Sequence, residues 1–220
     1  GIPLSIKVPW NDPATLLATV DDTIAGVILE PVQGLTGARD LPVELIAAAR
    51  KACDRSGAQL IFDEVQCGVG RCGAFTTAQA IGITPDLLTL AKGLASGLPI
   101  AAVVTSDAIA AQIKQGDLGS TFGGGPVPCA AALATLAVID EERLCENAVA
   151  IGEFLRHGAL ALGPDKVVAV QGRGLLLGLR LRRPAVEVQT ALLRHHIIVG
   201  TSSDPSVLRL MPPLSFSASE

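Results

Sequence analysis

Short apolar runs alternate with stretches of helical periodicity along the first two thirds of the chain. The runs that predict strands span residues 24–30, 59–62, 87–91 and 100–105. Their continuous apolar character is typical of strands buried on both faces of a parallel sheet. Residues 41–56 carry apolar side chains at helical spacing and are followed by Gly57, a residue that commonly ends a helix. The pattern predicts an α/β fold with a mainly parallel sheet.

The pattern changes after about Pro164. Before it, we expect one long helix from about Cys129 to Leu162, and a helix capped by Ser106 or Asp107. After it, short apolar runs at 167–170, 175–181, 197–200 and 207–211 surround one helical stretch at about 185–195. We therefore expect a partial large domain over residues 1–163 and a partial small α+β domain over residues 164–220.

The composition restricts the class of protein. The chain has 220 residues, of which 49% are hydrophobic and 17% charged, so it can bury a core and is not a disordered protein. So few charges suggest a surface that packs against a partner chain. The formal charge of −4 and the lack of a basic stripe argue against a nucleic-acid ligand.

Targeting and cysteine patterns point to the cytoplasm. No apolar run approaches the ~20 residues of a membrane-spanning helix, and the N-terminus does not resemble a signal peptide. Five cysteines without a secretory signal are typical of free thiols in a reducing compartment. Cys67 and Cys72 do not have a common zinc spacing, so we expect no metal site.

Three features carry candidate chemistry. Asp63 and Glu64 follow the buried run 59–62, although such an acid can also simply cap the next turn. Lys92 follows another buried run; where water is scarce a lysine can act as a nucleophilic amine, but it can also extend to the surface. The third feature is a glycine-rich stretch at 119–125, which leads into a helix.

That glycine-rich stretch carries hydroxyl groups at Ser120 and Thr121. Hydroxyls, backbone amides and a helix start together favour phosphate binding, although many such stretches are only turns. An acid, a lysine about 30 residues later and a phosphate-binding loop about 30 residues further are what pyridoxal 5′-phosphate requires. The lysine would form the Schiff base, and the acid would keep the pyridine nitrogen protonated.

Several longer stretches resemble the class III (fold type I) pyridoxal-phosphate aminotransferases and follow the order of that family. The stretches are EPVQG at 30–34, IFDEVQ at 61–66, GVGRCG at 68–73, PDLLTLAKGLASGLPIAAVV at 85–104, GSTFGG at 119–124, GRGLLLGL at 172–179 and VLRLMPPL at 207–214. The resemblance covers nearly the whole chain but only about the C-terminal half of the family's usual length.

The resemblance implies roles around the cofactor ring. Lys92 resembles the Schiff-base lysine, which also moves a proton between the substrate Cα and the cofactor. Asp63 resembles the partner of the pyridine nitrogen. Val65 would press on one face of the ring, and Gln66 would hydrogen-bond to its 3-hydroxyl group.

The resemblance also implies further contacts and a reaction. Thr121, with Ser120, would reach the cofactor phosphate of a neighbouring subunit, which implies a homodimer. Arg209 resembles an arginine that grips a substrate carboxylate, and Glu30 would be a second acid near the cofactor. The implied reaction is ping-pong transfer of an amino group from an amine or amino acid to an oxo acid.

Two departures and two other hypotheses remain. Leu35 stands where many relatives carry a glutamate that pairs with the carboxylate-binding arginine, and Pro126 stands where relatives often have asparagine. Because half of the family's length is missing, the chain could instead be a truncated, non-catalytic remnant that keeps the fold and the dimer surface. A nucleotide-binding α/β domain is disfavoured because no GxGxxG follows the first strand.

Overall fold

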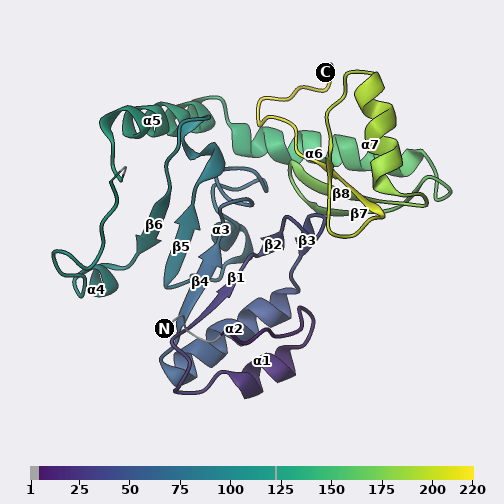
Figure 1. The fold of residues 1–220 in the computed structure, drawn as a ribbon. Coiled ribbons are helices and arrows are strands. Elements are labelled where there is room, and N and C mark those ends of the chain that lie inside the picture. The colour runs from purple at the N-terminus through teal and green to yellow at the C-terminus, as the bar shows by residue number, and fades with distance from the viewer. Residues whose placement is uncertain (1–4, 122) are drawn as a thin grey trace.

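The structure is a computed structural model that describes residues 5–121 and 123–220 (Figure 1). Residues 1–4 of the first predicted domain and Phe122 of the glycine-rich stretch lie outside the described residues. The helices are α1 (Pro13–Thr19), α2 (Val43–Ser56), α3 (Thr77–Ile81), a 3-10 turn η1 (Lys92–Ala95), α4 (Asp107–Ala110), α5 (Pro126–Glu141), α6 (Leu144–Ala161) and α7 (Ala185–Arg194). The strands are β1 (Gly26–Leu29), β2 (Val32–Gln33), β3 (Arg39–Asp40), β4 (Gln59–Asp63), β5 (Leu87–Leu90), β6 (Ala102–Thr105), β7 (Val167–Arg173), β8 (Leu176–Leu181), β9 (Gly200–Thr201) and β10 (Val207–Leu210).

The larger sheet has the strand order β1-β4-β5-β6. β1, β4 and β5 run parallel to one another, and β6 pairs with β5 in the antiparallel direction. The register sets Asp63 opposite Thr89, so the carboxyl ends of β4 and β5 meet at one edge of the sheet. The predicted α/β fold with a mainly parallel sheet is confirmed.

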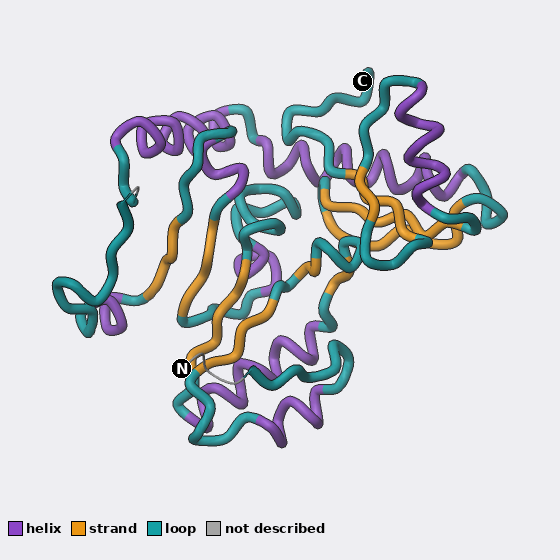
Figure 2. The backbone as a smooth tube through the Cα atoms, in the orientation of Figure 1, coloured by secondary structure: helices purple, strands orange, loops and turns teal. Residues whose placement is uncertain are grey.

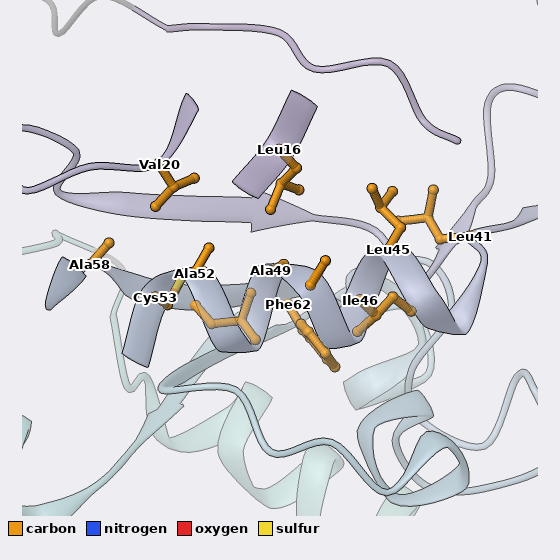
Figure 3. Close-up of a cluster of buried hydrophobic side chains, with 12 residues drawn as sticks. Leu16, Val20, Leu41, Leu45, Ile46, Ala49, Ala52, Cys53, Ala58 and Phe62 are labelled. Atoms are coloured by element: carbon orange, nitrogen blue, oxygen red, sulfur yellow. The ribbon is translucent and has the colours of Figure 1, made fainter. Parts of the chain in front are cut away.

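One face of this sheet packs against α2. The buried side of α2 contributes Ile46, Ala49 and Cys53, which pack with Phe62 of β4 (Figure 3). Leu60 of the same strand belongs to this cluster. The helix ends as predicted at Gly57, whose φ of 81° is left-handed and is readily adopted by a residue without a Cβ. The helical periodicity seen in the sequence therefore predicts which side chains of α2 form the core against this sheet.

The opposite face of the larger sheet is open, so the prediction of strands buried on both faces is wrong for this chain. Side chains alternate between the faces of a strand, which directs Ile61 and Asp63 away from α2. On the neighbouring strands, Ile28 is 65% exposed and Val103 is 62% exposed. The register aligns Ile28 with Ile61, and Val103 with Thr89. An apolar strip therefore faces solvent.

The single long helix predicted for residues 129–162 is two helices, α5 and α6, which lie nearly end to end along the top of Figure 1. The break falls at Glu142 and Arg143, and Arg143 has a left-handed φ of 52°. Leu144 then turns inward and is buried, which fixes the new helix against the core. α5 also begins earlier than predicted, because Pro126 takes the first helical position that suits its fixed φ.

The smaller sheet has the order β7-β8-β10-β9, with antiparallel pairing throughout. Its core joins α6 and α7 to the strands through Ala159, Leu177, Ala185 and Leu208. The strand predicted at 197–200 begins only at Gly200. The division into domains at residue 163 stays a prediction. Among residues 5–121 and 123–220, no helix combines the length and apolar character needed to cross a bilayer.

Candidate active site

Lys92 lies two residues beyond the end of β5 and begins the turn η1. Its φ of 50° is unusual for a residue with a side chain and costs roughly 1–2 kcal/mol, and such strain often occurs at functional positions. Its Nζ donates a hydrogen bond to Gln66 Oε1 at 3.1 Å. The side chain is exposed, so the prediction that water is scarce around this amine is wrong for the chain by itself.

Asp63 is the last residue of β4 and its side chain is half-buried. Its Oδ1 accepts hydrogen bonds from the backbone N–H of Val65 at 3.1 Å and from Thr89 Oγ1 at 3.3 Å. These donors, one of them on the adjacent strand, hold the carboxylate at the edge of the sheet without a cationic partner among the described residues. The acid is thereby fixed but remains available to a positive charge.

Gln66 connects Lys92 to the C-terminal part of the chain. Besides accepting from Lys92, its Nε2 donates to Met211 Sδ at 3.5 Å. All three residues, together with Val65, line a cavity of about 810 Å³. Small and apolar side chains of α5 also line this cavity. The structure thus brings together three of the predicted site residues, Val65, Gln66 and Lys92.

Arg71 is a second cation in the wall of this cavity. Its Nη1 donates to the carbonyl oxygens of Leu175 and Pro212, which fastens the segment after β10 to the loop after β4. Burial lowers the pKa of its guanidinium group. No carboxylate lies within ion-pair distance of Arg71 among the described residues.

Arg209 and Glu30 do not line the cavity but are joined to it through Gly34. Arg209 Nη1 donates to Gly34 O at 3.2 Å, and its Nε donates to Thr201 O at 2.7 Å. Glu30 Oε2 accepts from the backbone N–H of Gly34 at 3.3 Å. Gly34 in turn lies against the side-chain amide of Gln66.

Ser120 and Thr121 lie apart from these residues. Both are exposed, and neither lines the cavity. They belong to the long connection from α4 to α5, which runs along the outer side of β6 as a loop in Figures 1 and 2. The structure does not bring them to Lys92 within one chain.

Glu64 is a residue whose role the sequence pattern did not separate from that of Asp63. It is fully buried, and its carboxylate accepts from the backbone N–H groups of Thr77 at 2.7 Å and Ala78 at 2.9 Å. It therefore supplies acceptors for backbone N–H groups in the first turn of α3, which have no partner within the helix. Thr76 and Gln79 form a capping box at the same helix end. The capping-box spacing was the available signal that a helix begins there.

The donor set at this edge suits pyridoxal phosphate. It offers an accessible amine, a fixed carboxylate and a side-chain amide at the carboxyl ends of parallel strands, where α/β sheets bind ligands. The amine and the amide line the cavity, whereas Asp63 lies outside its lining. The cavity volume lies within the range of small-molecule sites. No cluster of three or more metal-ligating side chains occurs in the described parts of the chain.

Comparison with solved structures identifies the fold as that of aminotransferases. Ornithine aminotransferase from Toxoplasma gondii ME49 superposes with a TM-score of 0.90 at 29% identity, over 97% of this chain and 52% of that one. Acetylornithine aminotransferase from Elizabethkingia anophelis gives a TM-score of 0.87 at 31% identity, over 96% of this chain and 55% of that one.

Sequence comparison then identifies the family within the aminotransferases. The family model for class-III aminotransferases matches residues 11–220, and the chain belongs to this family. It is 46% identical over 207 residues to acetylornithine aminotransferase of Mycobacterium tuberculosis (strain H37Rv), covering 94% of this chain and 52% of that protein. The chain spans about half the length of the curated relatives it matches. Class III aminotransferases, such as the acetylornithine and ornithine enzymes, use pyridoxal phosphate.

Proposed function

We propose that the chain forms the lysine-bearing part of a pyridoxal-phosphate aminotransferase that moves an amino group from an amino acid to an oxo acid. The observation that carries the proposal is the Lys92–Gln66 hydrogen bond at the cavity, with the carboxylate of Asp63 fixed at the end of β4, three residues before Gln66 in the chain. A lysine amine next to a side-chain amide and a carboxylate is the set of groups that this cofactor needs. Membership of the class III family supports the same conclusion.

The bound cofactor would supply an electron sink that stabilises negative charge at the substrate Cα. Lys92 would hold the cofactor and then carry the proton from the substrate Cα, because its amine is exposed at the cavity. Asp63 would keep a positive charge on the ring nitrogen. Val65 would cover one ring face, and Gln66 would contact the ring hydroxyl.

We propose that the amino donor carries a carboxylate, which Arg209 would bind. Its Nη2 has no hydrogen-bond partner among the described residues, whereas Nε and Nη1 are both engaged. The guanidinium group is thus oriented with one nitrogen free to bind an anion. Relatives named acetylornithine and ornithine aminotransferase favour a donor of that chemical class. Glu30 would act indirectly, through Gly34.

We further propose a cytoplasmic homodimer. Ser120 and Thr121 are exposed and lie outside the cavity of their own chain, which fits a role toward the cofactor phosphate of a neighbouring subunit. The five cysteines form no disulfide, in keeping with a reducing compartment.

The test is to incubate the purified chain with pyridoxal phosphate, reduce with borohydride, and map the modified lysine by mass spectrometry. We expect the label on Lys92 and its loss in Lys92→Ala, whereas Lys51→Ala, which removes an exposed lysine of α2, retains it. An unlabelled Lys92 rejects the covalent role. Amine transfer to an oxo acid, measured in parallel, distinguishes the enzyme from the non-catalytic remnant that the half-length chain also allows: labelling without transfer supports the remnant.

A further inference from the structure

Gly34 is a buried residue whose backbone contacts two of the candidate site residues. Its N–H donates to Glu30 Oε2, and its carbonyl oxygen accepts from Arg209 Nη1. The same carbonyl oxygen also accepts from the N–H groups of Gly37 and Ala38, which fixes the local turn. The peptide at Gly34 is therefore held rigidly between β1 and β10.

The side-chain position of Gly34 is filled by Gln66. A Cβ built on Gly34 would lie 2.3 Å from Gln66 Cδ, 2.4 Å from Oε1 and 2.5 Å from Nε2. Carbon atoms in contact normally lie about 3.5–4.0 Å apart. The φ of Gly34 is outside the positive region, so alanine could adopt this backbone conformation. The position requires glycine for space and not for backbone freedom.

We infer that Gly34 is a positioning residue: its missing side chain creates the slot that holds the Gln66 amide against Lys92. The significance of this role for the reaction rests on the proposed function. The amide in this slot accepts from Lys92 Nζ at 3.1 Å and donates to Met211 Sδ at 3.5 Å. Because the Gly34 carbonyl also accepts from Arg209, one residue contacts both the predicted cofactor-binding amide and the predicted carboxylate-binding guanidinium group.

A side chain at residue 34 has a specific expected effect. The atoms it would meet are the end of a flexible side chain, so Gln66 can turn away while the fold stays intact. Gly34→Ala would then break the Lys92–Gln66 hydrogen bond and leave the packing of the hydrophobic core unchanged. This separates positioning from packing, since a packing role would lower the melting temperature without a selective change at Lys92.

The experiment measures the acetylation rate of Lys92 in the cofactor-free chain by mass spectrometry, with the exposed Lys51 and Lys114 as internal references. In Gly34→Ala we expect the relative rate at Lys92 to rise roughly two- to fivefold, the size expected for losing one interaction of a solvent-exposed charge. The matched control is Gly158→Ala, because a Cβ there meets nothing within 4 Å. It should leave the rate unchanged.

A second variant tests whether Gly34 acts through Gln66. In a Gln66→Ala background, Gly34→Ala should have no further effect on Lys92. An unchanged Lys92 rate in folded Gly34→Ala, an effect that persists without Gln66, or a Gly34→Ala chain that does not fold would each overturn the inference. Borohydride trapping of pyridoxal phosphate on Lys92 is measured separately. If trapping fails while the acetylation result holds, the proposed function is wrong and the positioning role of Gly34 stands.

Discussion

Glu64 and Asp63 are adjacent acids, and the structure predicts opposite consequences for their removal. Glu64 is fully buried and accepts the N–H groups of Thr77 and Ala78, whereas Asp63 is half-buried at the sheet edge. Glu64→Ala would leave two backbone donors at the start of α3 without an acceptor. Each hydrogen bond to a charged group contributes about 1.5–3 kcal/mol, so we expect a loss of about 3–6 kcal/mol in the free energy of unfolding.

That loss is large against the ~5–15 kcal/mol by which most domains are stable. For a chain of this size each kcal/mol shifts the melting temperature by about 2–4 °C, so Glu64→Ala should melt at least 6 °C lower. Thermal unfolding followed by circular dichroism measures this directly. Asp63→Asn is the matched control: the asparagine oxygen can still accept from Val65 N–H and Thr89 Oγ1, so stability should change by less than about 1 kcal/mol while cofactor-dependent transfer is abolished. A Glu64→Ala protein that melts within 2 °C of the original chain would refute the assignment.

Two further predictions concern stability. Gly152→Ala in α6 should destabilise the chain by about 1–3 kcal/mol in urea titrations, because the new Cβ would lie 2.2 Å from the carbonyl oxygen of Gly174. Gly158→Ala in the same helix meets nothing within 4 Å and should stabilise the chain by about 0.5–1 kcal/mol. Equal effects of the two substitutions would contradict the close approach of Gly152 to Gly174. Burial raises the pKa of Cys67 to about 12, so the folded thiol stays protonated above pH 9, where the unfolded thiol ionises. Stability relative to Cys67→Ser should therefore fall by about 1.4 kcal/mol per pH unit between about pH 9 and 12, and a constant difference between pH 8 and 10 would disprove it.

The sequence predicted the parallel core of the fold because that core depends on local patterns. Apolar runs at 59–62 and 87–91 became β4 and β5, and the helix before Gly57 ended where the glycine required it. The break between α5 and α6 could not be predicted, because neither glycine nor proline marks it. Arg143 adopts a left-handed conformation there, and Leu144 is buried by tertiary packing.

The candidate site was predictable in its residue types and strand-edge placement, but not in its contacts. Asp63 ends β4 and Lys92 lies two residues beyond the end of β5, and the parallel pairing of these strands puts both at one edge of the sheet. The exposure of Lys92 depends on tertiary packing around the turn η1, which the local sequence does not encode. The contact of Gly34 with Gln66 joins segments far apart in the chain, and no local periodicity reports such a contact.

The uncovered side of the larger sheet sets the dielectric environment of the predicted chemistry. Asp63 extends from that side, where Ile28 of the neighbouring strand β1 is also exposed, so water can approach its carboxylate. A charge pair 4 Å apart interacts by about 1 kcal/mol in bulk water and by about 4 kcal/mol at the effective dielectric constant near 20 of a protein surface. Any layer that excludes water from this side would therefore strengthen the pull of Asp63 on a cationic ring several-fold, without moving a single atom of the site.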